Sequence, residues 1–148
     1  MTRVSLLLVV LLGACTIGGN SHKERQLAEL RAQRALWQQQ RILDYQYVLR
    51  ADCFCDPDYM APRLVAVRDG RFASAVDSAT GQPGRYAAAQ FNPTVDSLFV
   101  LAERTIRDDA VQATIAYDAE LHYPTRIVTV RPGVADGDGA ILASNLTR

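Results

Sequence analysis

The chain has 148 residues, of which 49% are hydrophobic and 22% are charged, with 16 basic and 16 acidic side chains. A domain of this size buries about two-thirds of its unfolded surface, so its stability requires neither a metal nor a disulfide framework. The balanced charge argues against a nucleic-acid-binding protein, because such binding depends on a concentrated basic face.

The first fifteen residues carry the pattern of an export and lipidation signal. Arg3 precedes the apolar stretch 4–12, which is too short to cross a bilayer as a helix but has the length of a signal-peptide core. The block 12–15, Leu-Gly-Ala-Cys, matches a bacterial lipobox. The sequence therefore predicts that residues 1–14 are a signal peptide and that Cys15 is lipidated, so that its acyl chains hold the protein in a lipid bilayer.

The residues after the lipobox indicate where the protein is held. Thr16 occupies the position at which an aspartate favours retention of a lipoprotein in the inner membrane of many Gram-negative bacteria. We therefore expect the protein to be anchored in the outer membrane, with its domain facing the periplasm. The small, flexible composition of residues 15–21 is typical of a tether. Residues 22–148 are then expected to form a single globular domain that begins with a helix.

A helix is predicted from residue 22 to about residue 43, a run rich in Gln, Arg, Glu, Leu and Ala that contains neither Gly nor Pro. Ser21 and Glu24 have the spacing of a capping box at the start of this helix. Its apolar stripe is broken, so we expect the first turns to be solvated and the end near Trp37 to dock on the core.

Three strands are predicted in the first half of the chain, over residues 45–55, 63–68 and 71–76. The first strand leads into a turn at residues 56–58. Asp69 and Gly70 join the second strand to the third, and both residue types suit a tight type I′ hairpin turn. The long connection 77–93 is predicted to be a mobile surface loop or a lid.

A second helix is predicted to begin after Thr94, which acts as its cap, with Asp96 in the first turn. Its apolar residues recur at spacings of three and four and define a face that should lie on a sheet: Val95, Leu98, Phe99, Ala102 and Ile106. Three further strands are predicted over residues 111–117, 125–130 and 140–146. This order of elements favours an α+β fold, in which an antiparallel sheet of about five or six strands carries one or two helices on one face.

Cys53 and Cys55 are the residues with the most distinctive chemistry. An oxidising compartment favours a disulfide, although on a regular strand their Cα atoms would lie about 6.6 Å apart, near the upper end of the disulfide range. The turn that follows would have to bend the chain. Two alternatives stay open: thiol-redox exchange, which the neighbouring aspartates disfavour, and a copper or zinc site with Cys53, Cys55 and His122 as ligands.

Six blocks of the predicted mature chain have a characteristic order and spacing: Trp37, 44–47, 53–57, 65–70, 94–99 and 117–125. Together they resemble the uncharacterised family of bacterial lipoproteins known as domain of unknown function 6174. This resemblance implies no catalytic residue, substrate or cofactor. It also implies a glycine in the last block at the position where this chain has His122.

These observations support two functional hypotheses. The first is a membrane-anchored envelope lipoprotein that acts as a non-catalytic binding or interaction module. Its partner would be an envelope protein or a small ligand, and its contact surfaces would be residues 53–59, 77–93 and 117–124. The second is a metal-binding or thiol-redox protein that uses Cys53 and Cys55. No constellation of acid, base and nucleophile is visible, so we predict no enzymatic activity, no catalytic residue and no cofactor.

Overall fold

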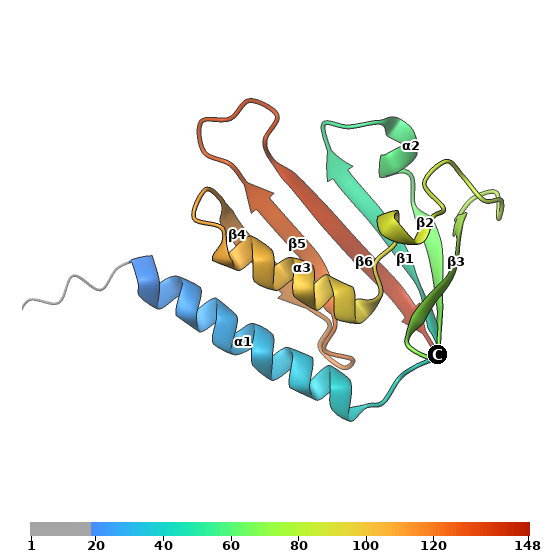
Figure 1. The fold of residues 1–148 in the computed structure, drawn as a ribbon, viewed down its shortest axis with the longest axis horizontal. Helices are drawn as coiled ribbons and strands as arrows, with labels where there is room; N and C mark the ends of the chain where they lie inside the picture. The colour runs from blue at the N-terminus through green and yellow to red at the C-terminus, as the bar shows by residue number, and fades with distance from the viewer. Residues whose placement is uncertain (1–18) are drawn as a thin grey trace, which may run out of the picture.

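The computed structural model describes residues 19–148, which form one six-stranded antiparallel sheet with two long helices on one face (Figure 1). The helices are α1 (Gly19–Gln39), α2 (Pro57–Met60) and α3 (Val95–Arg107), with a 3₁₀ turn η1 (Ala89–Phe91). The strands are β1 (Tyr45–Cys53), β2 (Arg63–Arg68), β3 (Arg71–Asp77), β4 (Gln112–Tyr117), β5 (Pro124–Val130) and β6 (Gly139–Thr147). The predicted α+β class is therefore confirmed.

The sheet consists of two groups of three strands that meet in the middle. Its order is β3-β2-β1-β6-β5-β4, so neighbouring strands within each group are also neighbours in sequence. The two groups are joined where β1 pairs antiparallel with β6, in a register that places Leu49 opposite Ala143 and Cys53 opposite Gly139. The end of β1 therefore lies beside the start of β6, although the two segments are far apart in sequence.

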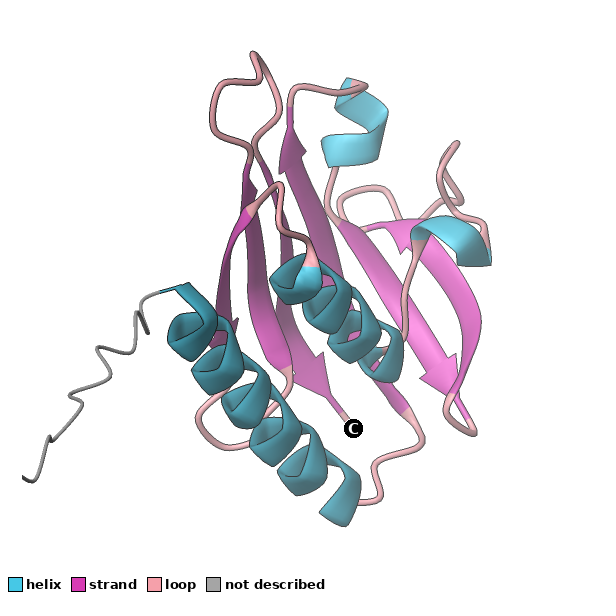
Figure 2. Ribbon diagram, turned by 60° about the vertical axis from the view of Figure 1, so that its left-hand side comes forward, coloured by secondary structure: helices cyan, strands magenta, loops and turns pink. Residues whose placement is uncertain are grey.

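Helix α3 packs its apolar face on the sheet, next to α1 (Figure 2). The five residues predicted for that face are all at most 1% exposed: Val95, Leu98, Phe99, Ala102 and Ile106. The helix begins as predicted after Thr94, whose side-chain oxygen accepts a hydrogen bond from the amide of Ser97 at 3.3 Å. A cap of this kind provides a partner for one of the amides that a helix start leaves without one.

Two buried tyrosines of β1 hold the start of α3. The hydroxyl of Tyr45 accepts a hydrogen bond from the amide of Val95 at 2.9 Å, and the hydroxyl of Tyr47 donates one to the carbonyl oxygen of Pro93. Trp37 of α1 packs edge-on against the Tyr45 ring, with 5.6 Å between the ring centroids. Both long helices are therefore attached to the same strand.

Helix α1 differs from the prediction at both ends. It begins at Gly19, so Ser21 lies inside the helix and not at its cap, and it ends at Gln39, before Arg41 adopts a φ of 52°. Leu27 and Leu30 are already buried, so docking on the core begins earlier than predicted. No helix among residues 19–148 has both the length and the apolarity that a membrane span requires. The predicted signal peptide 1–14, Cys15 and the first residues of the tether lie outside the described residues.

The hairpin between β2 and β3 is confirmed, with Asp69 at φ 49° and Gly70 at φ 70°, the positive values that a type I′ turn requires at both central positions. The predicted end of the first strand was wrong by two residues, because β1 stops at Cys53. In place of a simple turn, the chain then forms the short helix α2. The carboxylate of Asp56 caps α2 by accepting a hydrogen bond from the amide of Asp58 at 2.9 Å.

Replacing Phe99 with alanine is expected to lower the free energy of unfolding by about 3 to 5 kcal/mol, because it leaves a cavity under α3. Val100 is 37% exposed on the same helix, and the matched control Val100→Ala should cost less than about 1 kcal/mol. Chemical denaturation of both variants measures the difference. Equal, small losses would show that α3 does not bury this face.

Stability should fall at alkaline pH. Burial raises the pKa of Tyr45 to about 12 from the usual 10.0, although the hydrogen bond from Val95 acts in the opposite direction. A pKa that is higher in the folded state contributes stability that is complete below pH 10 and is lost as the pH rises towards 12. Tyr45→Phe should therefore reduce the pH-dependent loss in unfolding free energy by about 2 to 3 kcal/mol. Identical pH profiles for the two proteins would contradict this role.

Candidate functional site

The structure joins the sulfur atoms of Cys53 and Cys55, as the disulfide prediction expects. Their Cα atoms are 5.4 Å apart, closer than on a regular strand, because the strand ends and the amide of Cys55 turns back to donate to the carbonyl of Cys53 at 3.0 Å. Phe54 lies between them with 83% of its surface exposed. The cysteine pair therefore closes a small turn at the end of β1.

The alternative metal site is not assembled in the structure. His122 lies in the loop between β4 and β5, whereas Cys53 pairs with Gly139 at the opposite end of the sheet. Within the described residues, no group of three or more His, Cys, Asp or Glu side chains could hold a metal ion. The structure therefore does not bring the alternative ligands Cys53, Cys55 and His122 together, and sequence alone does not show which ends of the strands meet.

The position of His122 explains the glycine that the family resemblance implies there. Its φ is 64°, in the left-handed region that glycine adopts most easily. In this chain the imidazole Nδ1 lies 3.0 Å from the amide oxygen of Gln33 in α1. His122 therefore contacts α1, away from the cysteine pair.

Two of the three predicted contact surfaces come together beside α2. Tyr59 of α2 packs edge-on against Tyr86 and Phe91 of the 77–93 connection, with ring centroids 5.2 and 6.4 Å away. We call these three residues the aromatic cluster. The carboxylate of Asp56 also accepts a hydrogen bond from the Tyr86 hydroxyl at 2.9 Å. The second half of the predicted loop or lid is thus fixed to α2.

Asp56 is the electrostatic centre of these contacts. Hydrogen bonds from the Asp58 amide and the Tyr86 hydroxyl, together with the Arg85 guanidinium, hold the pKa of its carboxyl group below its usual value. Arg85 forms an ion pair with it at 2.9 Å. The carboxylate is therefore ionised at neutral pH and already has several partners.

Arg63 lies below the aromatic cluster and is only 5% exposed. Its Nε donates to the side-chain oxygen of Asn92 at 2.9 Å, and its Nη1 donates to the carbonyl of Tyr59 at 2.6 Å. The guanidinium carbon lies 5.3 Å from the centre of the Tyr59 ring. Burial lowers the pKa of this guanidinium, which still carries its charge at neutral pH.

Asn92 connects Arg63 to the 77–93 connection. It is 1% exposed, and its amide nitrogen donates to the carbonyls of Tyr86 and Ala88 at 2.7 and 2.8 Å. All the polar groups of this side chain thus have partners, as buried groups require. Arg63 and Asn92 together fix residues 86–92 against the sheet.

Two adjoining cavities form a groove on the helix-covered face of the sheet. The larger has a volume of about 340 Å³ and the smaller about 220 Å³, and both are lined by Tyr59, Leu101 and Ile141. Ala51, Cys53 and Ile127 line the larger cavity, while Leu49, Phe91 and Arg63 line the smaller one. The groove thus runs along α3 from the cysteine pair to the buried arginine, with mostly apolar walls.

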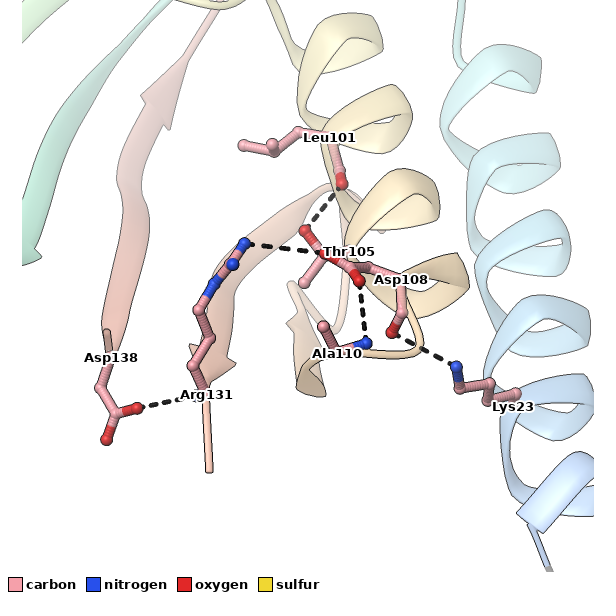
Figure 3. A network of polar contacts seen from close by, with 7 residues as sticks. All are labelled: Lys23, Leu101, Thr105, Asp108, Ala110, Arg131 and Asp138. Carbon is pink, nitrogen blue, oxygen red and sulfur yellow. Dashed lines mark hydrogen bonds and ion pairs between the residues drawn. The ribbon is translucent and has the colours of Figure 1, made fainter. Parts of the chain in front are cut away.

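The far wall of the groove is tied to the end of α3 (Figure 3). Asp138, which lines the larger cavity, accepts a hydrogen bond from the amide of Arg131 at 2.8 Å. The guanidinium of Arg131 lies 3.7 Å from the carboxylate of Asp108, and Lys23 of α1 donates to the carbonyl of Asp108 at 3.3 Å. These contacts join the β5–β6 loop to both long helices.

The third predicted contact surface, residues 117–124, lies apart from the groove. The carbonyl of Leu121 accepts a hydrogen bond from the side chain of Gln40 at 2.8 Å, beside the end of α1. The sheet face opposite the helices has a wider hollow of about 750 Å³, lined in part by Val48, Arg126 and Leu142. That hollow contains no side chain with the combination of burial and charge that Arg63 has.

Sequence reasoning missed Arg63 and Asn92. A signal for Arg63 was present, because alternation along β2 places it on the same face as the buried Val65 and Val67. A charged residue on a core-facing position needs an explanation, since burying a charge is costly. Asn92 gave no comparable signal, because its importance comes from contacts with residues distant in sequence.

Comparisons with known proteins provide a family and no function. Residues 29–148 match a family whose description is "family of unknown function (DUF6174)". None of the curated proteins and none of the solved structures matches the chain.

Asn92→Ala should lower the free energy of unfolding by about 2 to 4 kcal/mol, because it removes the hydrogen-bond partner of the buried Arg63 Nε and that of the Tyr86 carbonyl oxygen. It should also make residues 77–93 sensitive to limited proteolysis. Gln90→Ala, at an exposed position two residues away, is the control and should leave both measurements unchanged. If the Asn92→Ala protein resists cleavage as wild type does, Asn92 does not fix this segment.

Thiol labelling of the natively exported, folded protein should find neither Cys53 nor Cys55 free. Replacing both with serine should shift amide resonances around residues 52–58 while leaving the domain folded, because so short a loop contributes little chain-entropy stabilisation. A thiol-redox protein would instead show a labelled fraction that changes with the reduction potential. Free thiols with bound metal, in protein taken directly from its native host, would contradict the disulfide.

Proposed function

Since the chain belongs to the DUF6174 family, whose description names no activity, we propose a function from the structure: a non-catalytic binding module of the bacterial cell envelope that holds a small, mostly apolar ligand. The observation that carries this proposal is the groove between α3 and the aromatic cluster. Small-molecule sites are usually preformed apolar clefts of about 300 to 1,000 Å³ with a few polar groups. The larger cavity of the groove falls within that range.

The groove also has rigid walls, which a preformed binding site requires. One side is α3, whose adjoining apolar face is buried in the core, and the floor consists of paired strands. The other side is α2, which Asp56, Arg63 and Asn92 connect to the 77–93 connection. A ligand therefore meets a surface that needs little ordering on binding, which favours affinity.

The proposed anchor is an acylated Cys15, which would attach the module to the lipid bilayer, in the outer membrane facing the periplasm. Helix α1 begins at Gly19, four residues after this cysteine. Four extended residues span at most about 14 Å. The domain would therefore stay close to the lipid surface, where apolar molecules are concentrated.

Binding in the groove can be tested with N-phenyl-1-naphthylamine, a neutral apolar fluorescent probe. Wild-type protein should bind it saturably, and Leu101→Trp should abolish binding, because Leu101 lines both cavities and the larger side chain fills the space. Val100→Trp is the matched control, since Val100 is 37% exposed and lines neither cavity. Equal binding by the two variants would show that the groove is not the site.

Mass spectrometry of the mature protein from its native host should find an acylated N-terminal cysteine at position 15. Cys15→Ser should move the protein from the membrane fraction to the soluble fraction, because two or three acyl chains are what stable attachment requires. Cys53→Ser is the control and should remain in the membrane fraction. Recovery of an unmodified chain beginning at Met1 would contradict the proposed anchor.

A further inference from the structure

Arg63 lines the inner end of the groove as a buried cation without an anionic partner. We infer that the groove takes an aliphatic carboxylate, with the carboxylate on Arg63 and the hydrocarbon chain directed towards Cys53. This inference rests on the proposed function and names the ligand class of that same site.

The contacts of Arg63 are all with neutral groups. Besides Asn92 and the carbonyl of Tyr59, its Nη1 lies 3.3 Å from the carbonyl of Ala61. Within the described residues, no carboxylate lies within 4 Å of its nitrogens, and Nη2 donates no hydrogen bond. The guanidinium thus keeps a terminal nitrogen that is free to bind a ligand.

The other arginines near the groove show that carboxylates are not scarce in this region. Arg85 pairs with Asp56 at 2.9 Å, and Arg131 lies 3.7 Å from Asp108. Asp77, which is opposite Arg63 in the strand register, instead accepts hydrogen bonds from the amides of Ala79 and Thr80. These two more exposed arginines therefore have acidic partners, while the buried Arg63 has none.

A buried charge without a counter-charge is costly in a low-dielectric environment, where an added opposite charge interacts most strongly. Arginine presents a planar set of donors that fits a carboxylate and loses little side-chain freedom when it binds. Tyr59 lies against the guanidinium and limits its movement. A carboxylate is therefore the group that best complements this end of the groove.

The rest of the groove fits a hydrocarbon chain. The smaller cavity places Arg63 beside Leu49, Phe91 and Ile141, and the shared residues Leu101 and Ile141 continue into the larger cavity. The acidic side chains Asp136 and Asp138 lie at the opposite end, along the larger cavity. This charge distribution selects one orientation, because a carboxylate would be repelled at the aspartate end.

Titration with decanoate and with decan-1-ol, followed by amide chemical shifts, tests the inference on the wild-type protein. Decanoate should bind about tenfold or more tightly than the alcohol, since the two differ only in the charged group. Equal affinities would overturn the carboxylate assignment without reference to any variant. The uncharged probe N-phenyl-1-naphthylamine would still measure whether the groove binds an apolar molecule. Its binding therefore distinguishes failure of the carboxylate assignment from failure of the proposed function.

Variants of the arginine give a second measurement. Arg63→Gln should reduce the ratio of decanoate affinity to decan-1-ol affinity about tenfold or more, while Arg63→Lys should restore part of the preference by retaining the charge. Arg85→Gln, which removes an exposed arginine, is the matched control and should behave as wild type. If folded Arg63→Gln protein keeps the full preference for decanoate, Arg63 only fixes the 86–92 segment and the inference fails.

Discussion

The pairing of β1 with β6 is the interaction on which the rest of the structure depends. Each group of three strands can form by local hairpins, but only this pairing makes one sheet of them. It brings together residues near positions 50 and 140, so much chain entropy is lost before its contacts form. The joined sheet then provides a surface wide enough for both α3 and the groove beside it.

Buried polar groups specify how the helices sit on that surface. Tyr45 and Tyr47 attach β1 to the start of α3, and Arg63 with Asn92 attaches β2 to the segment that precedes α3. Apolar contacts tolerate sliding, whereas a buried donor without its acceptor is penalised. These hydrogen bonds therefore position α3 and the 86–92 segment, and in doing so they set the shape of the groove.

Arg63 has both a structural role and a proposed binding role. Its three hydrogen bonds to neutral groups organise the loop, but they leave the charge without an anion. A ligand carboxylate would compensate this charge and tighten the 86–92 segment. Binding and local order would then be coupled, because both depend on one guanidinium.

Sequence alone determined most of the local structure. The spacing of apolar residues identified the buried face of α3, the pair Asp69 and Gly70 identified the hairpin, and Thr94 identified the helix cap, because each depends on residues close in the chain. Alternation also placed Cys53 near a strand end, although it extended the strand to Cys55.

Tertiary structure decided which of these local features meet. It separated His122 from the cysteine pair, brought residues 53–59 to the 77–93 connection, and assembled the groove around Arg63. The physical reason is that a strand pattern specifies the face on which a side chain lies but not the neighbouring strand. Which strands become neighbours depends on packing summed over the whole sheet. In this sheet the neighbours β1 and β6 are separated by most of the sequence.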